Sequence, residues 1–290
     1  MQEIEYLRPV TVGEAVELLA RGDARVLAGG TDLIPQLREG RRTAARIVDL
    51  KYIPELIRIE RLPEGGWRVG AAASVGSLAA HAALMAEHRA LIESAQLIGS
   101  LQIQNRATLG GNLCNAAPSA DAVPLLIALC ATVEIAGASG KRTVAVESIP
   151  AAPGRSTLAP DEIVTSLLLP ATVQRSAARY LRFTPRREMD IAIAGSGVWI
   201  ALDQQGAVAA ARITLASVAP VPLRAPEAEK SLTGARPSRA VFEAAGRKAA
   251  QEAKPISDTR GSADYRRELV AVLTRRALAD CAAQLGISLA

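Results

Sequence analysis

Two glycine pairs are the residues whose types and spacing point most directly to chemistry. The first lies in Ala28-Gly29-Gly30-Thr31-Asp32-Leu33, which follows a short β-type run and precedes a helix. Adjacent glycines allow the backbone to turn sharply and to approach a ligand closely, and they leave backbone N–H groups free at the start of the next helix. This geometry suits a pyrophosphate. A tight turn without a ligand is the alternative interpretation of the same pair.

The second pair lies in Ala107-Thr108-Leu109-Gly110-Gly111-Asn112, where a hydroxyl and a carboxamide beside the glycines can hydrogen-bond a phosphate or a sugar. Asp121 follows in an apolar neighbourhood, where a carboxylate needs a partner. A ribityl or ribose hydroxyl would serve as that partner. The alternative is that Asp121 is the N-cap of a helix over Leu125–Leu129.

Metal ligands are poorly represented in the sequence. Cys114, Cys130 and Cys281 have spacings that match no zinc or iron–sulfur pattern. We interpret them as thiols in a reducing compartment, with Cys114 as a small packed residue. His81 and His88 are seven residues apart, but no cysteine or carboxylate completes a ligand set, which favours a plain surface helix. No metal site is predicted.

The charge distribution does not indicate a nucleic-acid-binding protein. The net charge is +5, but basic and acidic residues alternate along most of the chain. Only 3% of the residues are aromatic, so no platform is expected on which bases could stack. A basic cluster near the first glycine pair is either a solvated face or a docking patch for an acidic partner. Its members are Arg38, Arg41, Arg42, Arg46 and Lys51.

Length and composition indicate a globular chain. The 290 residues, 49% of them hydrophobic, provide enough interior for two domains. The longest uncharged apolar stretches, Ile191–Leu202 and Ala122–Val133, are too short to predict a membrane span. Glu3 and Glu5 precede any apolar run, so we expect no secretory signal and a cytoplasmic location.

The first fifty residues alternate in a βαβ manner around the first glycine pair. Thr11 is a plausible N-cap for an amphipathic helix that ends near Gly22. A strand over Arg25–Ala28, a helix over Leu33–Arg38 and a strand over Ile47–Leu50 are predicted to follow. This arrangement would place the glycine pair between a strand and a helix.

A second unit begins near Pro54. It is predicted to contain a hairpin at Glu64-Gly65-Gly66, a long helical region from Ser74 past Leu97, and strands over Ala131–Ile135 and Thr143–Val146. The stretch Ile149–Pro160 and the break after Pro170 are candidate boundaries.

The last part of the chain is predicted to be a separate α+β domain. Three β-rich runs, Ala177–Phe183, Ile191–Leu202 and Val208–Val218, precede three helical segments. The last helix begins near Ser262, and one side of it is predicted to carry residues spaced by four: Tyr265, Leu269, Leu273, Ala277, Cys281 and Leu285.

The ordered set of motifs closely resembles the FAD-binding medium subunit of the molybdenum hydroxylases, the xanthine dehydrogenase and carbon monoxide dehydrogenase family. Its elements are the two glycine pairs about eighty residues apart, Asn105-Arg106 ahead of the second pair, and Arg186-Arg187-Glu188-Met189-Asp190-Ile191-Ala192 downstream. The resemblance covers essentially the whole chain. It implies an α+β fold: a two-subdomain FAD-binding fold of the vanillyl-alcohol-oxidase-like (PCMH) type over 1–53 and 54–174, and a C-terminal α+β domain over 175–290 with a three-stranded sheet and helices.

The resemblance also implies a cofactor site. The pyrophosphate of FAD would lie across the two glycine motifs, with Asp121 on the ribityl or ribose hydroxyls and Arg182 near the isoalloxazine. Some relatives place an aromatic residue against the flavin ring, where this chain has Ile98. The residues implied at the cofactor are Leu27, Ala28, Gly29, Gly30, Thr31, Asp32, Leu33, Ile98, Ile103, Thr108, Gly110, Gly111, Asn112, Asp121, Val164, Arg182 and Ile191.

The function implied by the resemblance is electron transfer. FAD would be bound non-covalently, would receive electrons from the [2Fe–2S] clusters of a small subunit, and would pass them to NAD, oxygen or a quinone. Substrate hydroxylation would occur on a molybdopterin large subunit, in a heterotrimer or its dimer. The alternatives are a self-contained FAD-dependent oxidase or reductase and a flavin-free scaffold subunit. We expect Gly30→Val and Gly111→Val each to lose FAD in a chain that still folds.

Overall fold

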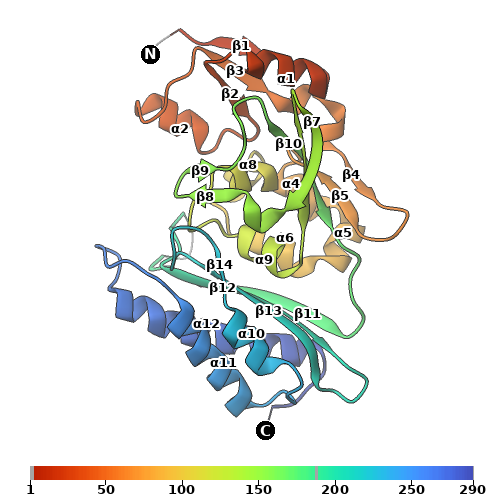
Figure 1. Ribbon diagram of the computed structural model, residues 1–290, viewed down its shortest axis with the longest axis vertical. Coiled ribbons are helices and arrows are strands. Elements are labelled where there is room, and N and C mark those ends of the chain that lie inside the picture. Colours follow the sequence, from red (N-terminus) through yellow and green to blue (C-terminus); the bar gives the residue numbers. More distant parts are fainter. Residues whose placement is uncertain (1–2, 187–188, 290) are drawn as a thin grey trace.

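The computed structural model describes residues 3–186 and 189–289. The described chain contains three main β-sheets, each accompanied by helices (Figure 1). The first is a parallel sheet in the order β1-β3-β2. Thr11 caps α1 as predicted, because its Oγ1 accepts a hydrogen bond from the Glu14 N–H. The elements are β1 (Glu5–Leu7), α1 (Val12–Ala20), β2 (Ala24–Leu27), α2 (Leu33–Arg38), β3 (Arg46–Asp49) and the 3-10 turn η1 (Leu50–Tyr52).

The second sheet has five antiparallel strands in the order β4-β5-β10-β6-β7. The strands are β4 (Ile59–Arg61), β5 (Trp67–Gly70), β6 (Thr132–Gly137), β7 (Gly140–Ala145) and β10 (Ile163–Leu169). A small hairpin, β8 (Pro150–Ala152) and β9 (Arg155–Ser156), lies beside it. The accompanying helices are α3 (Pro54–Ile57), α4 (Val75–Ala80), α5 (Ala82–Glu87), α6 (Arg89–Ala95), α7 (Leu101–Gln104), α8 (Leu109–Cys114) and α9 (Val123–Ala128), and η2 (Val146–Ser148) is a 3-10 turn.

The predicted helical region that Ser74 opens is present, but as the three helices α4, α5 and α6, because the structure breaks this stretch at both histidines. His81 has an extended backbone, and its Nδ1 accepts from the Leu84 N–H, so it caps α5. His88 separates α5 from α6 and is buried, with no hydrogen-bond partner for Nε2. A continuous apolar pattern therefore concealed two local breaks.

The third sheet is antiparallel, in the order β11-β12-β13-β14. Its strands are β11 (Ser176–Phe183), β12 (Ala194–Leu202), β13 (Val208–Ala216) and β14 (Leu223–Arg224). The three predicted strands are present, and the two-residue β14 adds a fourth. We propose domain boundaries after residues 53 and 174, since each of the three main sheets then falls within one segment.

The three helices that follow this sheet are α10 (Pro226–Leu232), α11 (Arg239–Glu252) and α12 (Ala263–Gln284). They cover its outer face, and α6 and α9 lie on the other face (Figure 1). The predicted side of α12 used a spacing of four residues, but an α-helix has 3.6 residues per turn, so that series leaves the buried face. Tyr265, the first residue of the series, is exposed. The buried residues are Arg266, Val270, Leu273, Thr274, Ala277, Leu278, Cys281 and Ala282.

Alternation along β12 explains how two layers meet on this sheet. Val198 and Ile200 belong to the core beneath α10–α12, and Trp199, between them, packs against the core of the second sheet. Gly197 lies on the Trp199 side. A Cβ at this glycine would be 3.0 Å from the Pro124 carbonyl carbon, so the absent side chain lets α9 approach the strand.

A buried ion pair joins the two halves of the chain. Arg182 on β11 donates through Nη1 to Asp121 Oδ2 at 2.5 Å, and the Tyr180 hydroxyl donates to Asp121 Oδ1 at 3.0 Å. The Arg182 and Asp121 side chains are only 7% and 8% exposed. Burial raises the pKa of Asp121 to about 6, with Arg182 and Tyr180 opposing that rise. Asp121 makes no cap bond to α9, so the N-cap alternative is wrong.

No helix among the described residues is long and apolar enough to span a membrane.

Arg182→Met is expected to lower the free energy of unfolding by about 3–5 kcal/mol, because it leaves a buried carboxylate without its cation. The loss should be smaller in the double variant Asp121→Asn/Arg182→Met, which removes both charges. It should also shrink as the pH falls, since protonation neutralises Asp121. Arg275→Met, which breaks a half-exposed pair with Glu243, is the control and should cost less than about 1 kcal/mol. Urea denaturation of the four proteins measures these differences. Equal losses in the single and double variants would contradict the argument.

Candidate functional site

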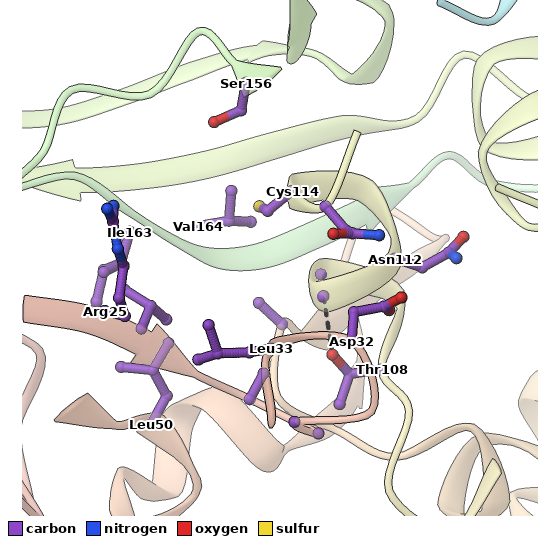
Figure 2. Close-up of a pocket in the computed structure, with 18 of the residues that line it drawn as sticks. Arg25, Asp32, Leu33, Leu50, Thr108, Asn112, Cys114, Ser156, Ile163 and Val164 are labelled. Atoms are coloured by element: carbon purple, nitrogen blue, oxygen red, sulfur yellow. Dashed lines mark hydrogen bonds between the residues drawn. The ribbon is translucent and has the colours of Figure 1, made fainter. Parts of the chain in front are cut away.

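A pocket of about 300 Å³ lies between the first two sheets, with the two glycine motifs on its wall (Figure 2). The first motif follows β2, the second opens α8, and β10 with the segment before it supplies the opposite side. The predicted site residues that line it are Ala28, Gly29, Gly30, Thr31, Asp32, Leu33, Ile98, Thr108, Gly110, Gly111, Asn112 and Val164.

The first glycine loop presents free backbone donors. β2 ends at Leu27, which pairs with Asp49 of β3, and the chain then turns before α2 begins. No hydrogen bond within the described part of the chain uses the N–H groups of Gly29, Gly30, Thr31 or Asp32. Successive N–H groups without internal acceptors form a concavity that suits an anion.

Packing explains why this loop needs both glycines. A Cβ at Gly29 would lie 2.1 Å from the Arg106 carbonyl oxygen, so only glycine lets the two motifs meet. Gly30 has a φ of +80°, and its Cβ would lie 2.9 Å from Leu27 Cδ1. The prediction that Gly30→Val folds normally is therefore not supported, because the substitution strains the backbone whether or not a ligand is bound.

The two glycines of the second pair have different surroundings. Gly110 packs against the chain itself, since a Cβ there would lie 2.5 Å from the Ala71 carbonyl oxygen. A Cβ at Gly111 would meet only Thr108 Oγ1, at 3.0 Å, and Ala28 Cβ, at 3.9 Å. These two neighbours both line the pocket, so a side chain at Gly111 would occupy space between the two motifs.

Thr108 and Asn112 have unequal freedom to bind a ligand. Thr108 Oγ1 accepts from the Gly111 N–H at 2.9 Å, so this buried hydroxyl caps α8. Asn112 Oδ1 is buried and has no hydrogen-bond partner among the described residues, and Figure 2 shows the side chain at the pocket. A buried amide oxygen without a partner is costly, and a ligand group in the pocket would complete its hydrogen bonds.

Asp32 brings a carboxylate to the pocket. It occupies the N-cap position of α2 but makes no side-chain cap bond, so the carboxylate is free of that role. The residue is exposed at the pocket edge, yet desolvation by its surroundings raises its pKa. A carboxylate in such a place accepts hydrogen bonds from hydroxyl groups.

The remaining walls are largely apolar. Cys114 lies among them, and burial raises the pKa of its thiol to about 12, so it stays neutral as a packed residue. The apolar side chains around the pocket suit the flat face of an aromatic ligand. They include Leu33, Leu50, Ile98, Leu158, Ile163 and Val164.

Five predicted site residues lie outside this pocket. Leu27 is buried behind the first loop, Ile103 packs against Gly99, and Ile191 is 49% exposed. Asp121 and Arg182 bond to each other, and Arg182 lines a second cavity of about 330 Å³ between α6 and β11. Arg187 and Glu188 of the downstream motif lie outside the described residues.

Several pocket residues were missed at the sequence level. Arg25 and Glu162 carry charges into the lining, and Gln36 Nε2 reaches Asn115 Oδ1 across the pocket at 3.4 Å. Ser156 lies in the stretch that was predicted as a boundary. The proline and glycine content of that stretch resembles a linker, and only the fold brings Ser156 opposite the glycine loops.

The basic cluster is not one solvated face. Arg42 lines the pocket, and its Nη2 donates to the Gly154 carbonyl at 2.9 Å. Arg46 pairs with Glu5, and Lys51 pairs with Asp49 behind the first glycine loop. No group of metal-ligating side chains is found among residues 3–186 and 189–289.

Comparison with known proteins identifies the family. Residues 2–172 match the family described as "FAD binding domain in molybdopterin dehydrogenase", and residues 179–281 match the "CO dehydrogenase flavoprotein C-terminal domain". The putative xanthine dehydrogenase FAD-binding subunit of Escherichia coli K12 is 31% identical to this chain. The alignment spans 97% of each of the two chains.

Solved structures agree with the sequence comparison. A chain of carbon monoxide dehydrogenase from Hydrogenophaga pseudoflava superposes with a TM-score of 0.93, at 31% identity and over 98% of both chains. A chain of quinoline 2-oxidoreductase from Pseudomonas putida 86 gives a TM-score of 0.91, at 26% identity and over 98% of both chains. The chain therefore belongs to the family of FAD-binding flavoprotein subunits of the molybdenum hydroxylases, which includes those of xanthine and carbon monoxide dehydrogenases.

Proposed function

We propose that the pocket between the two glycine motifs holds the FAD of this flavoprotein subunit, with the pyrophosphate against the first loop. The observation that carries the assignment is the run of free N–H groups from Gly29 to Asp32 on the pocket wall. FAD fits the other donors and acceptors too, because the unpartnered Asn112 amide and the Asp32 carboxylate can bond its sugar and ribityl hydroxyls.

The remaining predicted residues are proposed in less direct roles. Leu27 supports the first loop from the core, and Ile98 and Val164 supply apolar contact. Asp121 and Arg182 are proposed at the flavin end of the site, where the cavity between α6 and β11 adjoins Arg182. Ile103 and Ile191 are proposed to line the flavin or adenine part of the site.

The bound flavin supplies the redox chemistry, accepting and releasing electrons. The chain's own task is binding, orientation and exclusion of water, and we assign no residue an acid–base role. As the FAD-binding subunit of a multi-subunit molybdenum hydroxylase, it takes electrons from [2Fe–2S] clusters of a small subunit. We propose a molybdopterin large subunit as the third partner, in a heterotrimer or its dimer. This agrees with relatives named FAD-binding subunit and medium chain.

The electron acceptor is proposed to be NAD, oxygen or a quinone. A cytoplasmic location is also proposed, supported by three cysteines that form no disulfide.

A self-contained flavin oxidase is less well supported, since neither histidine lines the pocket to anchor a flavin covalently. The free donors and the unpartnered Asn112 argue against a flavin-free scaffold.

Gly111→Val is expected to abolish FAD binding in a chain that still folds, because the new side chain enters the space between the two motifs. Gly13→Val is the matched control: Gly13 also lies in the first turn of a helix, and its Cβ would meet nothing within 4 Å. The visible spectrum and the FAD content of each purified protein are the measurements, with circular dichroism to check folding. Wild-type FAD content in Gly111→Val would show that the pyrophosphate lies elsewhere.

The flavin of the isolated chain is expected to stay oxidised when hydroxylase substrates are added, because the reaction centre that oxidises them lies on partner subunits. The substrates to test anaerobically are xanthine, carbon monoxide and nicotine. Bleaching of the flavin absorbance should require co-expressed iron–sulfur and molybdopterin subunits. Bleaching of the isolated chain by any of these substrates would favour a self-contained oxidoreductase.

A further inference from the structure

Lys51 contacts the first glycine loop through a hydrogen bond to its backbone. It lies in η1, directly after β3, and its Nζ donates to the Ala28 carbonyl oxygen at 2.7 Å. The same ammonium donates to Asp49 Oδ1 at 2.5 Å, and the Tyr6 hydroxyl donates to Asp49 Oδ2. The Asp49 side chain is 2% exposed, so this carboxylate anchors Lys51 in the core.

The bond to Ala28 sets the direction of the next N–H group. All described peptide bonds are trans, and in a trans peptide unit the C=O and the following N–H point in opposite directions. Because Lys51 holds the Ala28 oxygen, the Gly29 N–H points away from Lys51. This N–H begins the run of donors from Gly29 to Asp32 that have no acceptor within the described chain.

We propose that Lys51 is a positioning residue for FAD, which holds the Ala28 carbonyl and thereby aims the first glycine loop at the pyrophosphate. The inference rests on the proposed function. It assigns Lys51 to cofactor binding although Lys51 does not line the pocket. A charged donor suits this task, since hydrogen bonds from an ammonium are about twice as strong as those between neutral groups.

The electrostatic surroundings keep Asp49 ionised and make Lys51 sensitive to alkaline pH. Burial alone would raise the pKa of Asp49, but the hydrogen bonds from Lys51 and Tyr6 outweigh it and hold the pKa below its usual range. Burial lowers the pKa of Lys51, Asp49 opposes this, and the charge of Arg106 lowers it further. Lys51 therefore loses its proton at a lower pH than an exposed lysine.

The test compares FAD dissociation constants of the full chain by titration of the flavin-free protein. Lys51→Met is expected to weaken FAD binding about 10-fold or more, the effect of losing one charge-assisted hydrogen bond. Because Lys51→Met also strips a buried carboxylate of its cation, the double variant Asp49→Asn/Lys51→Met removes that charge as well. It should keep the wild-type melting temperature and show the same loss of affinity. The control is Lys230→Met, at an exposed residue of α10, which should bind as the wild type does.

The pH dependence separates positioning from plain stability. Wild-type affinity should fall as the pH rises from about 7 towards 10.5, the ordinary pKa of lysine, because Lys51 loses its charge on the way. The double variant, measured alongside, has no such group and should show only the titration of FAD itself. Parallel pH profiles, or wild-type affinity in the double variant, would overturn the role of Lys51. If the wild type binds no FAD, the proposed function fails instead, so the two failures are distinguishable.

Discussion

The site depends on two places where backbone meets backbone without an intervening side chain. Gly29 lies against the Arg106 carbonyl and Gly110 against the Ala71 carbonyl, each so close that a Cβ would overlap an oxygen. The first contact joins the loop after β2 of the parallel sheet to the segment before α8, and the second packs α8 against the end of β5; the pocket lies beside both. The two glycine pairs therefore serve the fold, and the proposed FAD site uses the same loops. Of these four glycines, Gly111 alone has neither a positive φ nor a neighbour closer than 3.0 Å to an added Cβ.

The polar groups around the two loops differ in whether they have hydrogen-bond partners within the chain. Thr108 satisfies one N–H of α8 and Lys51 satisfies the Ala28 carbonyl, whereas the N–H groups from Gly29 to Asp32 have no acceptor within the described chain. A folded chain pays for unpartnered buried groups, and it tolerates them where a ligand supplies the missing bonds. The unpartnered Asn112 oxygen belongs to this set. In the proposed site, these groups would bond the pyrophosphate and the hydroxyls of FAD.

Local patterns in the sequence were sufficient for many of the elements and for the two glycine motifs, but they did not predict β10, the middle strand of the second sheet. The strand, turn and helix around Gly29 are all present, as are the three long strands of the last sheet. The breaks at His81 and His88 could not be predicted, because one arises from a side-chain cap and the other from burial of an imidazole between helices. The cap at His81 is local, formed with Leu84 three residues on, whereas the burial of His88 depends on tertiary neighbours; an apolar pattern encodes neither. The stretch around Ser156 likewise gained its place in the pocket only from folding.

Asp121 shows most clearly what a sequence motif leaves undetermined. Its apolar surroundings correctly indicated a carboxylate in need of a partner, and the family resemblance suggested a hydroxyl of the cofactor. In the structure the partners are Arg182 and Tyr180, from a strand some sixty residues away in the chain. The pair ties the cofactor-binding half to the last sheet and fixes Arg182 at the edge of the cavity beside α6. In the proposed site Asp121 holds Arg182 in place for the flavin without touching the flavin itself, and Lys51 in turn holds the Ala28 carbonyl in place for the first loop.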